Sequence, residues 1–541
     1  MSREEFDHIV VGGGSVGCVA AARLVADGGH RVLLLEGGHS NRHPLLDLPP
    51  GIFKMINGSK FMHYHTTVPQ PHLSGRAHDI PQGNVLGGGS SVNAQVYMRG
   101  RPSDYDAWNA TLRGNNDGAD WSWGAVLKHL RGMEDNNRLN NDLHGFGGKL
   151  QVSDPGHIDE MSRWFVQAVQ GMGEPFNPDF NGSSQRGVGF YQFMNRNGRR
   201  SSAARAFLSP LEGDPRLTTR LQSRAERLII ENGRAVGVVW RDKSGTEQKS
   251  YATGEIIVTA GALITPKLLM LSGVGPADHL REFGIAVAAD LPGVGQNLID
   301  HPEVPIISTA NGRYGYFKQG SGWRMLWNGI QFKLFGSGRI LSAGVEAGAF
   351  VNPTDPAAEP TIQAFCVPIV YLDRDTLTLV ENTYGLTVTT VVVKPKSRGE
   401  VRLRSGNPAD KPLISPNLLK HPGDMAAMIE GQRFFVRAFQ TEPLASRVKR
   451  LAVPDPSKLD DATLAEHCRR FVKTNYHPAS TARMGADGDP MAVLDARMRV
   501  RGVDGLRVAD MSAVPDINAG NTNAPAMMLG DRCADFVMGR A

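Results

Sequence analysis

Three glycines and one glutamate near the start of the chain have the spacing of a dinucleotide-binding site. Gly12, Gly14 and Gly17 follow the G-x-G-x-x-G register, and Glu36 comes 19 positions after Gly17. Gly12 permits a tight turn, Gly14 lets a pyrophosphate approach the backbone, and Gly17 lets a helix pack closely. The free N–H groups at the helix start attract phosphates, and the glutamate can accept hydrogen bonds from ribose hydroxyls. This spacing alone does not distinguish FAD from NAD.

The sequence around these residues predicts the elements that hold them. Residues 6–11 form a short apolar run of strand type, residues 18–27 contain mostly good helix formers, and Gly28-Gly29 ends the helix. Residues 31–36 then form a second buried strand that ends on the glutamate. A structural turn without a ligand is the alternative interpretation, and the acid at the end of the second strand favours dinucleotide binding.

A second glycine-rich stretch lies within residues 81–101, where Gly87-Gly88-Gly89 is followed by Ser90-Ser91. We expect it to open an apolar helical run whose first N–H groups can face an anion or an electron-rich ring. A flexible linker is the alternative, and it fits poorly because the flanking residues are apolar rather than polar.

The remaining sequence predicts a change of architecture in the middle of the chain and a return to cofactor-type signals at its end. Residues 303–470 contain β-rich runs and a helical run, which indicates a separate sheet-plus-helix domain. The other expected elements are helices at 104–134, strands at 217–240, a buried strand at 255–261, a helix at 265–272, a strand at 505–510 that ends in Asp510, and a terminal helix at 523–538.

Length and composition are those of an ordinary enzyme with two or three domains. The chain has 541 residues, is 41% hydrophobic and 21% charged, and has a net charge of +5 spread along its length, so nothing indicates a nucleic-acid partner. No apolar run reaches the length of a membrane-spanning segment, and the start lacks the apolar core of a signal peptide. Four cysteines without metal-type spacing favour a reduced, cytoplasmic protein.

Two further patterns are interpreted as structural. Residues 52–80 carry four histidines at irregular spacing with no cysteine or acid at ligand distance, so we expect surface or pocket-lining side chains and no metal site. Residues 198–208 carry a basic patch, Arg199-Arg200 with Arg205, which we expect to be a solvated face.

Four motifs, taken together and in order, resemble one known family. The chain is similar over essentially its whole length to the glucose–methanol–choline (GMC) family of FAD-dependent alcohol oxidoreductases. The resemblance rests on residues 12–36, on residues 86–93, on residues 261–266 with 273–276, and on Tyr476-His477-Pro478 with residues 520–525.

The resemblance implies an α/β fold with a Rossmann-like FAD-binding domain and a second, antiparallel-sheet-plus-helices substrate domain. It implies a discontinuous FAD domain at residues 1–155, 200–300 and 470–541, and a substrate domain at residues 156–199 and 301–469. The position at which some members attach flavin through a histidine is Val92 here, so we expect non-covalent FAD. The implied cofactor-binding residues are Gly12, Gly14, Ser15, Gly17, Glu36, Leu86, Gly88, Gly89, Ser91, Asn93, Ala94, Ala225, Ala260, Gly261, Asp510 and Asn521.

Alcohol oxidation removes a proton from oxygen and a hydride from carbon, and a flavin N5 accepts the hydride. The proton needs a base that is neutral near pH 7, which suits histidine. The resemblance places His477 at the family's base position and Asn523 opposite it, where an amide can hold the hydroxyl and the developing alkoxide. This His–Asn pairing is similar to choline-type and aryl-alcohol-type members.

Several alternatives remain open from the sequence. A flavin-containing lyase on the same scaffold, a non-catalytic flavin-binding protein and a nicotinamide dehydrogenase are the competing classes. Oxygen or another acceptor could reoxidise the flavin, and the oligomeric state is not indicated. We expect an uncharged primary alcohol, aromatic or furanic, because residues 366–371 and 389–393 can line an apolar pocket and no acidic–aromatic cluster stands out for a cation.

Overall fold

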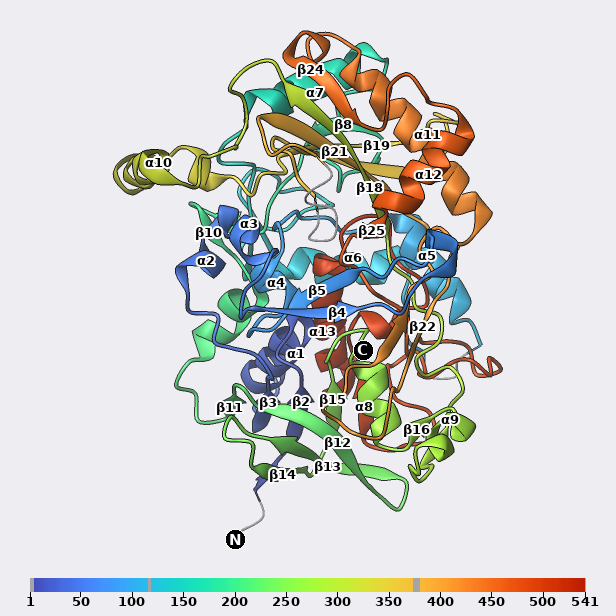
Figure 1. The fold of residues 1–541 in the computed structure, drawn as a ribbon. Helices are drawn as coiled ribbons and strands as arrows, with labels where there is room; N and C mark the ends of the chain where they lie inside the picture. Colours follow the sequence, from blue (N-terminus) through green and yellow to red (C-terminus); the bar gives the residue numbers. More distant parts are fainter. Residues whose placement is uncertain (1–3, 115–117, 373–379, 541) are drawn as a thin grey trace.

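The computed structural model describes residues 4–114, 118–372 and 380–540. Figure 1 shows a parallel sheet with its helices in one half of the molecule and an antiparallel sheet with its helices in the other. This is the mixed α/β fold predicted from the sequence, with an FAD-binding-type sheet and a second sheet beside it, so the predicted fold class is confirmed. The exact domain boundaries stay a prediction.

The parallel sheet is assembled from strands that lie far apart in the sequence. Its order is β11 (Leu217–Arg220), β3 (Val32–Leu35), β2 (His8–Val11), β15 (Ile256–Val258) and β26 (Leu506–Val508), and every neighbouring pair is parallel. The three central strands, β3, β2 and β15, are buried along their whole length, which explains their continuous runs of Ile, Val and Leu.

Helices from the two ends of the chain pack together beside this sheet. Helix α1 (Ser15–Ala26) contacts α13 (Asn523–Val537), and the contact is close because a Cβ on Gly530 would lie 2.6 Å from the Val16 carbonyl oxygen. A smaller sheet of β1 (Glu5–Phe6), β14 (Glu247–Ala252), β13 (Arg234–Arg241) and β12 (Arg224–Glu231) contacts β2 and β15. The first and last segments of the chain therefore share one core.

The antiparallel sheet forms the second half of the molecule. Helices α7 (Glu160–Gly171), α11 (Pro422–Phe439) and α12 (Asp461–Phe471) pack around it and share its apolar core. Its strand order is β24 (Val448–Val453), β18 (Pro302–Ala310), β21 (Gly385–Val392), β20 (Ile362–Val367), β19 (Ala347–Val351) and β8 (Gly187–Phe190), with β25 (Lys473–Thr474) also paired to β18.

The connecting segments add shorter elements. In chain order these are α2 (Pro44–Asp47), α3 (Ile52–Met55), β4 (Met62–Thr66), β5 (Asp79–Gly83), α4 (Gly89–Val92), α5 (Pro102–Thr111), α6 (Trp123–Met133), β6 (Glu134–Asn136), β7 (Leu150–Val152), β9 (Asn195–Arg196), β10 (Arg199–Arg200), α8 (Thr265–Leu271), β16 (Val274–Gly275), α9 (Ala277–Glu282), β17 (Ala289–Asp290), α10 (Gly322–Phe335), β22 (Glu400–Arg402) and β23 (Leu413–Ser415). Among the described residues, no helix is both long and apolar enough to cross a bilayer.

Two local expectations were wrong, and both errors involve the second glycine-rich stretch. The helix that follows Gly87-Gly88 is only the single turn α4, because Asn93 turns to an extended conformation with ψ 175°. Arg200 is not on a solvated face; it is buried and donates hydrogen bonds to the Leu46 and Ser90 carbonyls and to Asn93 Oδ1. The guanidinium fixes the end of α4, and burial lowers its pKa to about 9.

Candidate active site

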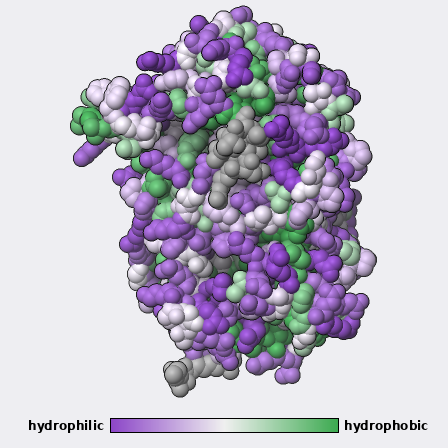
Figure 2. Space-filling view, in the orientation of Figure 1, coloured by the Kyte–Doolittle hydropathy of each residue, from purple (hydrophilic) through white to green (hydrophobic). Residues whose placement is uncertain are grey.

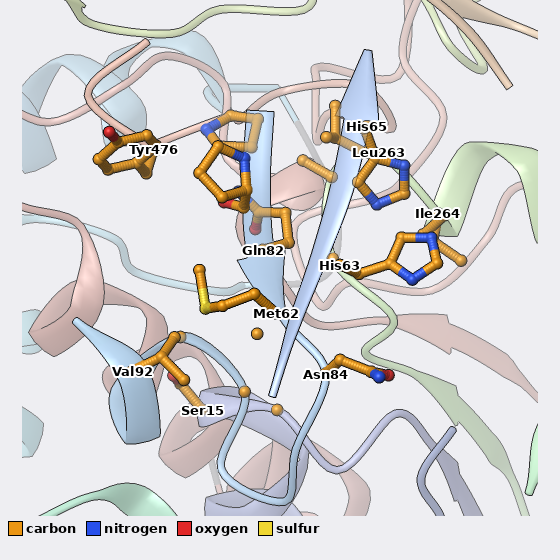
Figure 3. Close-up of a pocket in the computed structure, with 18 of the residues that line it drawn as sticks. Ser15, Met62, His63, His65, Gln82, Asn84, Val92, Leu263, Ile264 and Tyr476 are labelled. Carbon is orange, nitrogen blue, oxygen red and sulfur yellow. The ribbon is translucent and has the colours of Figure 1, made fainter. Parts of the chain in front are cut away.

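A cavity of about 690 Å³ lies where the two halves of the molecule meet. Its walls come from the turn after β2, from α4, from β4 and β5, from the turn after β15, from β18 and β20, and from the segments on either side of Asp510. In Figure 3, Ser15 and Val92 lie close together at one end, Tyr476 lies at the other, and His63 and His65 face Leu263 and Ile264.

The turn after β2 leaves no room for side chains. Gly12 has a φ of +112°, and a Cβ there would lie 2.5 Å from the Thr259 carbonyl oxygen. A Cβ on Gly17 would lie 1.9 Å from the Gly12 carbonyl oxygen, so this glycine lets α1 pack against the turn, as predicted from its spacing. Gly14 differs from both, because the nearest protein atom to a Cβ there is 3.8 Å away and the open side faces the cavity.

Glu36 lies directly after β3 and lines the cavity. Its Oε2 accepts a hydrogen bond of 2.8 Å from the Gly13 N–H, and its Oε1 accepts one of 2.6 Å from the Gly38 N–H. Burial raises the pKa of this carboxyl to about 7, although both backbone hydrogen bonds favour the ionised form. The carboxyl is thus fixed in place at the end of the strand, where the ribose of a dinucleotide is expected.

Most of the predicted cofactor-binding residues line this one cavity. Three do not: Gly17 packs the helix, and Leu86 and Ser91 hold the second glycine-rich turn together, because Ser91 Oγ donates 2.7 Å to the Leu86 carbonyl. The predicted residues that do line it are Gly12, Gly14, Ser15, Glu36, Gly88, Gly89, Asn93, Ala94, Ala225, Ala260, Gly261, Asp510 and Asn521, and the predicted catalytic residues His477 and Asn523 line it as well.

Asp510 connects the C-terminal segment to the turn after β15. Its Oδ2 accepts hydrogen bonds from the Gly261 N–H at 2.9 Å and from Thr265 Oγ1 at 2.6 Å, while its Oδ1 accepts from Ser512. This carboxylate comes after β26 as Glu36 comes after β3, so two strands of the sheet, separated by β2 and β15, are followed by acids at the cavity.

His477 belongs to a pair of histidines whose hydrogen-bonding roles can be worked out. His301 Nε2 lies 3.0 Å from the Val393 carbonyl oxygen, and its Nδ1 lies 3.0 Å from His477 Nδ1. A carbonyl only accepts, so His301 carries its hydrogen on Nε2, and burial keeps it neutral by lowering its pKa to about 4. His301 Nδ1 is then an acceptor, and His477 must donate from Nδ1.

The unprotonated nitrogen of His477 is therefore Nε2. This atom makes no hydrogen bond to the described residues, and His477 lines the cavity. Burial, with a smaller contribution from His301, holds the pKa of His477 well below its usual range. The ring is presented by a tight turn in which Tyr476 has a φ of +64° and the His477 N–H donates 3.0 Å to Asp300 Oδ1. This geometry provides a neutral proton acceptor at the cavity.

The two asparagines near α13 have different contacts. Asn523 Oδ1 accepts a hydrogen bond of 2.8 Å from Ser15 Oγ, and its Nδ2 lies 3.2 Å from Met194 Sδ, so this amide is held against the first glycine-rich turn. Asn521 Oδ1 accepts from Gln363 Nε2 at 3.3 Å, and its Nδ2 makes no hydrogen bond to the described residues. No hydrogen bond joins either asparagine to His477 in the described part of the chain.

The structure brings together at the cavity an acidic–aromatic cluster that did not stand out in the sequence. Glu303, Tyr371 and Tyr476 line it together, and Lys473 lies among them. Lys473 Nζ is 3.1 Å from Glu303 Oε2, and it lies 5.4 Å and 4.7 Å from the ring centres of the two tyrosines. Both charged side chains are only 6% exposed. The cluster thus contains its own cation.

The two runs expected to line an apolar pocket, residues 366–371 and 389–393, do so only in part, and Phe365 just before the first run adds to the wall. Phe365, Val367 and Thr389 line the cavity. Cys366 alternates to the other face of its strand and lies 4.0 Å from Ser162 Oγ, because successive strand residues point to opposite faces.

The histidines of residues 52–80 divide into two kinds. His63 and His65 line the cavity, as the sequence predicted. His72 is half-buried with Nε2 2.9 Å from the Leu418 carbonyl, and His78 is buried away from the cavity, so the expectation was wrong for His78.

One cluster elsewhere has metal-like geometry among the described residues. His129, Asp531 and Asp535 bring ligand atoms within 4.8 Å of one another. Arg23 from α1 already forms ion pairs with both aspartates, at 2.7 Å from Asp535, so the guanidinium supplies the positive charge here and joins α1 to α13.

Sequence reasoning did not find Asp300, His301, Glu303 and Lys473. A signal was present, since Asp300-His301-Pro302-Glu303 places three titratable residues at the start of an otherwise apolar strand. Their meeting with Lys473 and His477 depends on the pairing of β18 with β25, which brings Glu303 opposite Lys473 and could not be predicted from spacing.

Comparison with known proteins is consistent with this geometry. Models of the GMC oxidoreductase family match residues 6–303 and 395–530. The chain is 39% identical to an alcohol dehydrogenase [acceptor] of Pseudomonas putida, covering 98% of this chain and 96% of the relative, and 34% identical to the mitochondrial choline dehydrogenase of Mus musculus, covering 100% and 90%. A formate oxidase variant from Aspergillus oryzae superposes with a TM-score of 0.90 at 26% identity, covering 100% of this chain and 99% of that one.

The chain belongs to the GMC oxidoreductase family. It is therefore an FAD-dependent alcohol oxidoreductase, and the cofactor of the family suits the residues of this cavity. The turn at Gly12 and Gly14 offers backbone where a side chain would block a pyrophosphate, Glu36 lies at the ribose position, and Gly88 approaches the first turn so closely that a Cβ would lie 2.8 Å from Gly14 Cα.

Proposed function

We propose that this protein oxidises an uncharged primary alcohol to an aldehyde, with His477 as the general base. The observation that carries the proposal is the hydrogen-bond chain from the Val393 carbonyl through His301 to His477, which leaves His477 Nε2 unprotonated at the cavity. A base that is neutral at pH 7 can accept the hydroxyl proton directly. Because the pKa of His477 is low, the ring would hold this proton while the hydride leaves the carbon and would then release it to solvent.

FAD would be held non-covalently between the two glycine-rich turns, with Glu36 and Ala225 on its nucleotide side. Bound FAD supplies the acceptor for the substrate hydride. Val92 supports non-covalent binding, because it lines the cavity at the end of α4 with a hydrocarbon side chain that has no nucleophilic atom. Protein denatured in acid should therefore release all of its FAD into the supernatant.

The hydrogen bonds of the two asparagines bear on which amide holds the substrate hydroxyl. Asn523 was predicted for this role, and both ends of its amide are engaged by Ser15 and Met194. Asn521 keeps its Nδ2 without a hydrogen bond to the described residues, so we propose that this N–H stabilises the developing alkoxide while Asn523 positions Ser15. Asn521→Ala should then slow flavin reduction more than Asn523→Ala, and the reverse order would restore the original assignment.

The substrate end of the cavity supports an uncharged alcohol over a quaternary amine. The choline dehydrogenases among the relatives are named for a cationic substrate. Here the acidic–aromatic cluster that could attract such a cation already contains Lys473 in contact with Glu303. Phe365 and Val367 provide apolar surface for the body of the alcohol.

The buried thiols support a cytoplasmic location. Cys18, Cys366, Cys468 and Cys533 are all buried and unpaired, as expected in a reducing compartment. Reoxidation of the flavin requires oxygen or another acceptor. Admitting air after anaerobic reduction distinguishes an oxidase from a dehydrogenase.

The decisive experiment mixes the purified yellow protein anaerobically with benzyl alcohol, an aliphatic primary alcohol, choline and glucose in turn, and follows flavin absorbance. We expect rapid bleaching with the first two and slow or no bleaching with the others. Admission of air then identifies an oxidase by rapid return of colour and a dehydrogenase by its absence. No bleaching with any alcohol, in protein that holds FAD, would contradict the proposed reaction.

A further inference from the structure

Helix α10, Gly322–Phe335, has its apolar side on the outside of the protein. Trp323, Leu326, Trp327, Ile330 and Leu334 are 73%, 65%, 59%, 40% and 68% exposed. Their spacing of i, i+3, i+4, i+7 and i+11 places them in one continuous stripe along the helix. Figure 1 shows α10 projecting from the edge of the molecule, and Figure 2 shows hydrophobic surface at that edge.

The opposite side of α10 faces the protein and is mixed: Phe332 lies so close to Gly198 that a Cβ on that glycine would be 2.6 Å from its ring. Asn328 is the buried residue of this helix, and its Nδ2 donates 3.1 Å to the Gln319 carbonyl. Arg324 Nη1 donates 3.1 Å to Tyr384 Oη. A helix of a water-exposed protein normally buries most of its apolar surface, so a stripe that is left outside indicates a partner that covers it.

Most of the exposed large apolar side chains among the described residues lie on this helix. Of the eleven large apolar side chains that are exposed among the described residues, seven belong to α10, and the remaining four are scattered. Single exposed apolar residues are normal on protein surfaces, whereas a contiguous stripe of tryptophan, leucine and isoleucine marks an interaction surface.

The charged residues of the chain segment that carries the stripe are all of one sign. Residues 304–345 contain no aspartate or glutamate, and they contain five basic residues: Arg313, Lys318, Arg324, Lys333 and Arg339. Arg313, Lys318 and Lys333 are exposed. Exposed tryptophans beside lysines and arginines are the composition of helices that lie in the interface of an anionic bilayer, with the rings at headgroup level and the cations on the phosphates.

We propose that α10 docks this protein onto the surface of a bilayer that contains anionic phospholipid. The stripe Trp323/Leu326/Trp327/Ile330/Leu334 enters the interface, and Arg313, Lys318 and Lys333 contact the phosphate headgroups. The chain is held at the surface by one short helix and does not span the membrane.

Helix α10 lies beside the active-site cavity, so docking would bring the bilayer close to the place where substrate enters. Lys54 Nζ in α3 lies 3.8 Å from Met325 Sδ in α10, and Ile52 and Phe53 of the same short helix line the cavity. A bilayer bound by α10 would therefore lie next to the cavity wall, where an apolar alcohol dissolved in lipid could enter. This consequence rests on the proposed function, whereas the docking does not.

The experiment measures co-sedimentation of the FAD-containing protein with vesicles of phosphatidylcholine alone and with 30 mol% phosphatidylglycerol. The wild type should bind the anionic vesicles, with binding weakened by high salt, and should bind pure phosphatidylcholine less. The variant Trp323→Ser/Trp327→Ser/Leu334→Ser should lose this binding at least about tenfold. The matched control Phe146→Ser/Val287→Ser/Met491→Ser removes three exposed apolar side chains elsewhere and should bind like the wild type.

Two further measurements keep the result interpretable. Flavin reduction by a water-soluble alcohol should be the same in both triple variants, because none of the changed residues lines the cavity, so a loss of binding cannot be assigned to misfolding. Light scattering gives the oligomeric state. A wild type that does not sediment with anionic vesicles, or a stripe variant that sediments equally well, would overturn the proposal. So would an oligomer that the stripe variant converts to monomer, since a second copy would then cover the helix.

Discussion

The two ends of the cavity are built in different ways. The cofactor end is made largely of backbone in glycine-rich turns, and its first turn and Glu36 come from one β-α-β unit of the first 36 residues. The substrate end is made of side chains. Glu303, Lys473 and His477 line it from segments that are about 170 residues apart, and His301 contacts His477 from outside the cavity lining. The first turn of the cofactor site is a local property of the chain, whereas the reacting groups come together only after the antiparallel sheet has formed.

This difference determines what a substitution should do. At the cofactor end, a change should alter how much FAD is bound and leave the chemistry of the remaining holoenzyme intact. At the substrate end, a change should leave FAD bound and alter the rate, the substrate preference or the pH dependence. The four predictions below test that division, beginning with the largest expected effect.

His477→Ala should give the largest loss. The rate of anaerobic flavin reduction per bound FAD should fall about 10²–10⁴-fold, the contribution of a positioned general base, while FAD content stays normal. His421→Ala is the control, because His421 is an exposed helix cap outside the cavity. Stopped-flow absorbance gives the rate. If His477→Ala instead lost FAD and its remaining holoenzyme reduced at the normal rate, the residue would be structural and the division would fail.

Gly14→Ala and Gly12→Ala should separate cofactor binding from folding. A Cβ on Gly14 meets only the Thr259 carbonyl at 3.8 Å, so the variant should fold normally but lose FAD affinity about tenfold or more, since the methyl group points where the pyrophosphate must approach. A Cβ on Gly12 lies 2.5 Å from the Thr259 carbonyl oxygen, and its φ of +112° costs a non-glycine residue at least about 1–2 kcal/mol, so this variant should also be less stable.

The measurements are FAD titration of the apoprotein by fluorescence and thermal unfolding of the same apoprotein. Gly14→Ala with wild-type stability and weak FAD binding would support a direct approach of the cofactor to this turn. Equal loss of stability in both variants would mean that the two glycines serve only the packing of the turn.

The same division explains how much of the molecule could be predicted from the sequence. The β-α-β unit, the helix at Thr265–Leu271 and the terminal helix were predicted close to their bounds, because periodicity and glycine placement are local signals. The second glycine-rich helix was predicted too long, because the contacts that end it at Asn93 come from Arg200, more than 100 residues away.

The active site follows the same pattern. His477 and the asparagines could be assigned from the family resemblance, but the tautomer of His477 is set by His301 and the Val393 carbonyl, which no local pattern connects to it. The contact between Glu303 and Lys473 depends likewise on the register of β18 with β25. Helix α10 has apolar residues at helical spacing, but a sequence pattern does not reveal that this stripe faces outward.

Lys473→Met should change substrate preference at the substrate end. It removes the cation that contacts Glu303 and leaves a carboxylate beside Tyr371 and Tyr476, so the ratio of kcat/KM for choline to that for benzyl alcohol should rise about tenfold. Lys473→Arg keeps the charge and should keep the wild-type ratio. The variant should also be less stable, because removing one partner of a buried ion pair costs about 3–5 kcal/mol. An unchanged ratio in folded Lys473→Met would show that this cluster does not select the substrate.

The smallest expected effect is a change in pH dependence, and it compares the two ends directly. Each end holds a buried acid whose pKa is raised to about 7 by burial: Glu36 at the cofactor end and Asp300 at the substrate end. Asp300 Oδ1 accepts the His477 N–H at 3.0 Å. As pH rises through 7, Asp300 ionises and its negative charge makes His477 a stronger base, so flavin reduction should rise about two- to fivefold between pH 6 and 8.

Asp300→Asn should abolish that rise, because an amide keeps the acceptor oxygen but cannot ionise, while the decrease at low pH, where His477 becomes protonated, should remain. The pH dependence of the free energy of unfolding gives a second, independent check on the raised pKa of Asp300. A carboxyl whose folded pKa lies above its unfolded value of about 3.9 makes the fold less stable as pH rises from about 4 to 7, and the variant should lose this dependence.

Glu36→Gln is the comparison: it should change FAD affinity and its pH dependence but leave the rise in reduction rate. If the rise disappeared in Glu36→Gln and persisted in Asp300→Asn, the cofactor end would control the chemistry and the division between the two ends would be wrong.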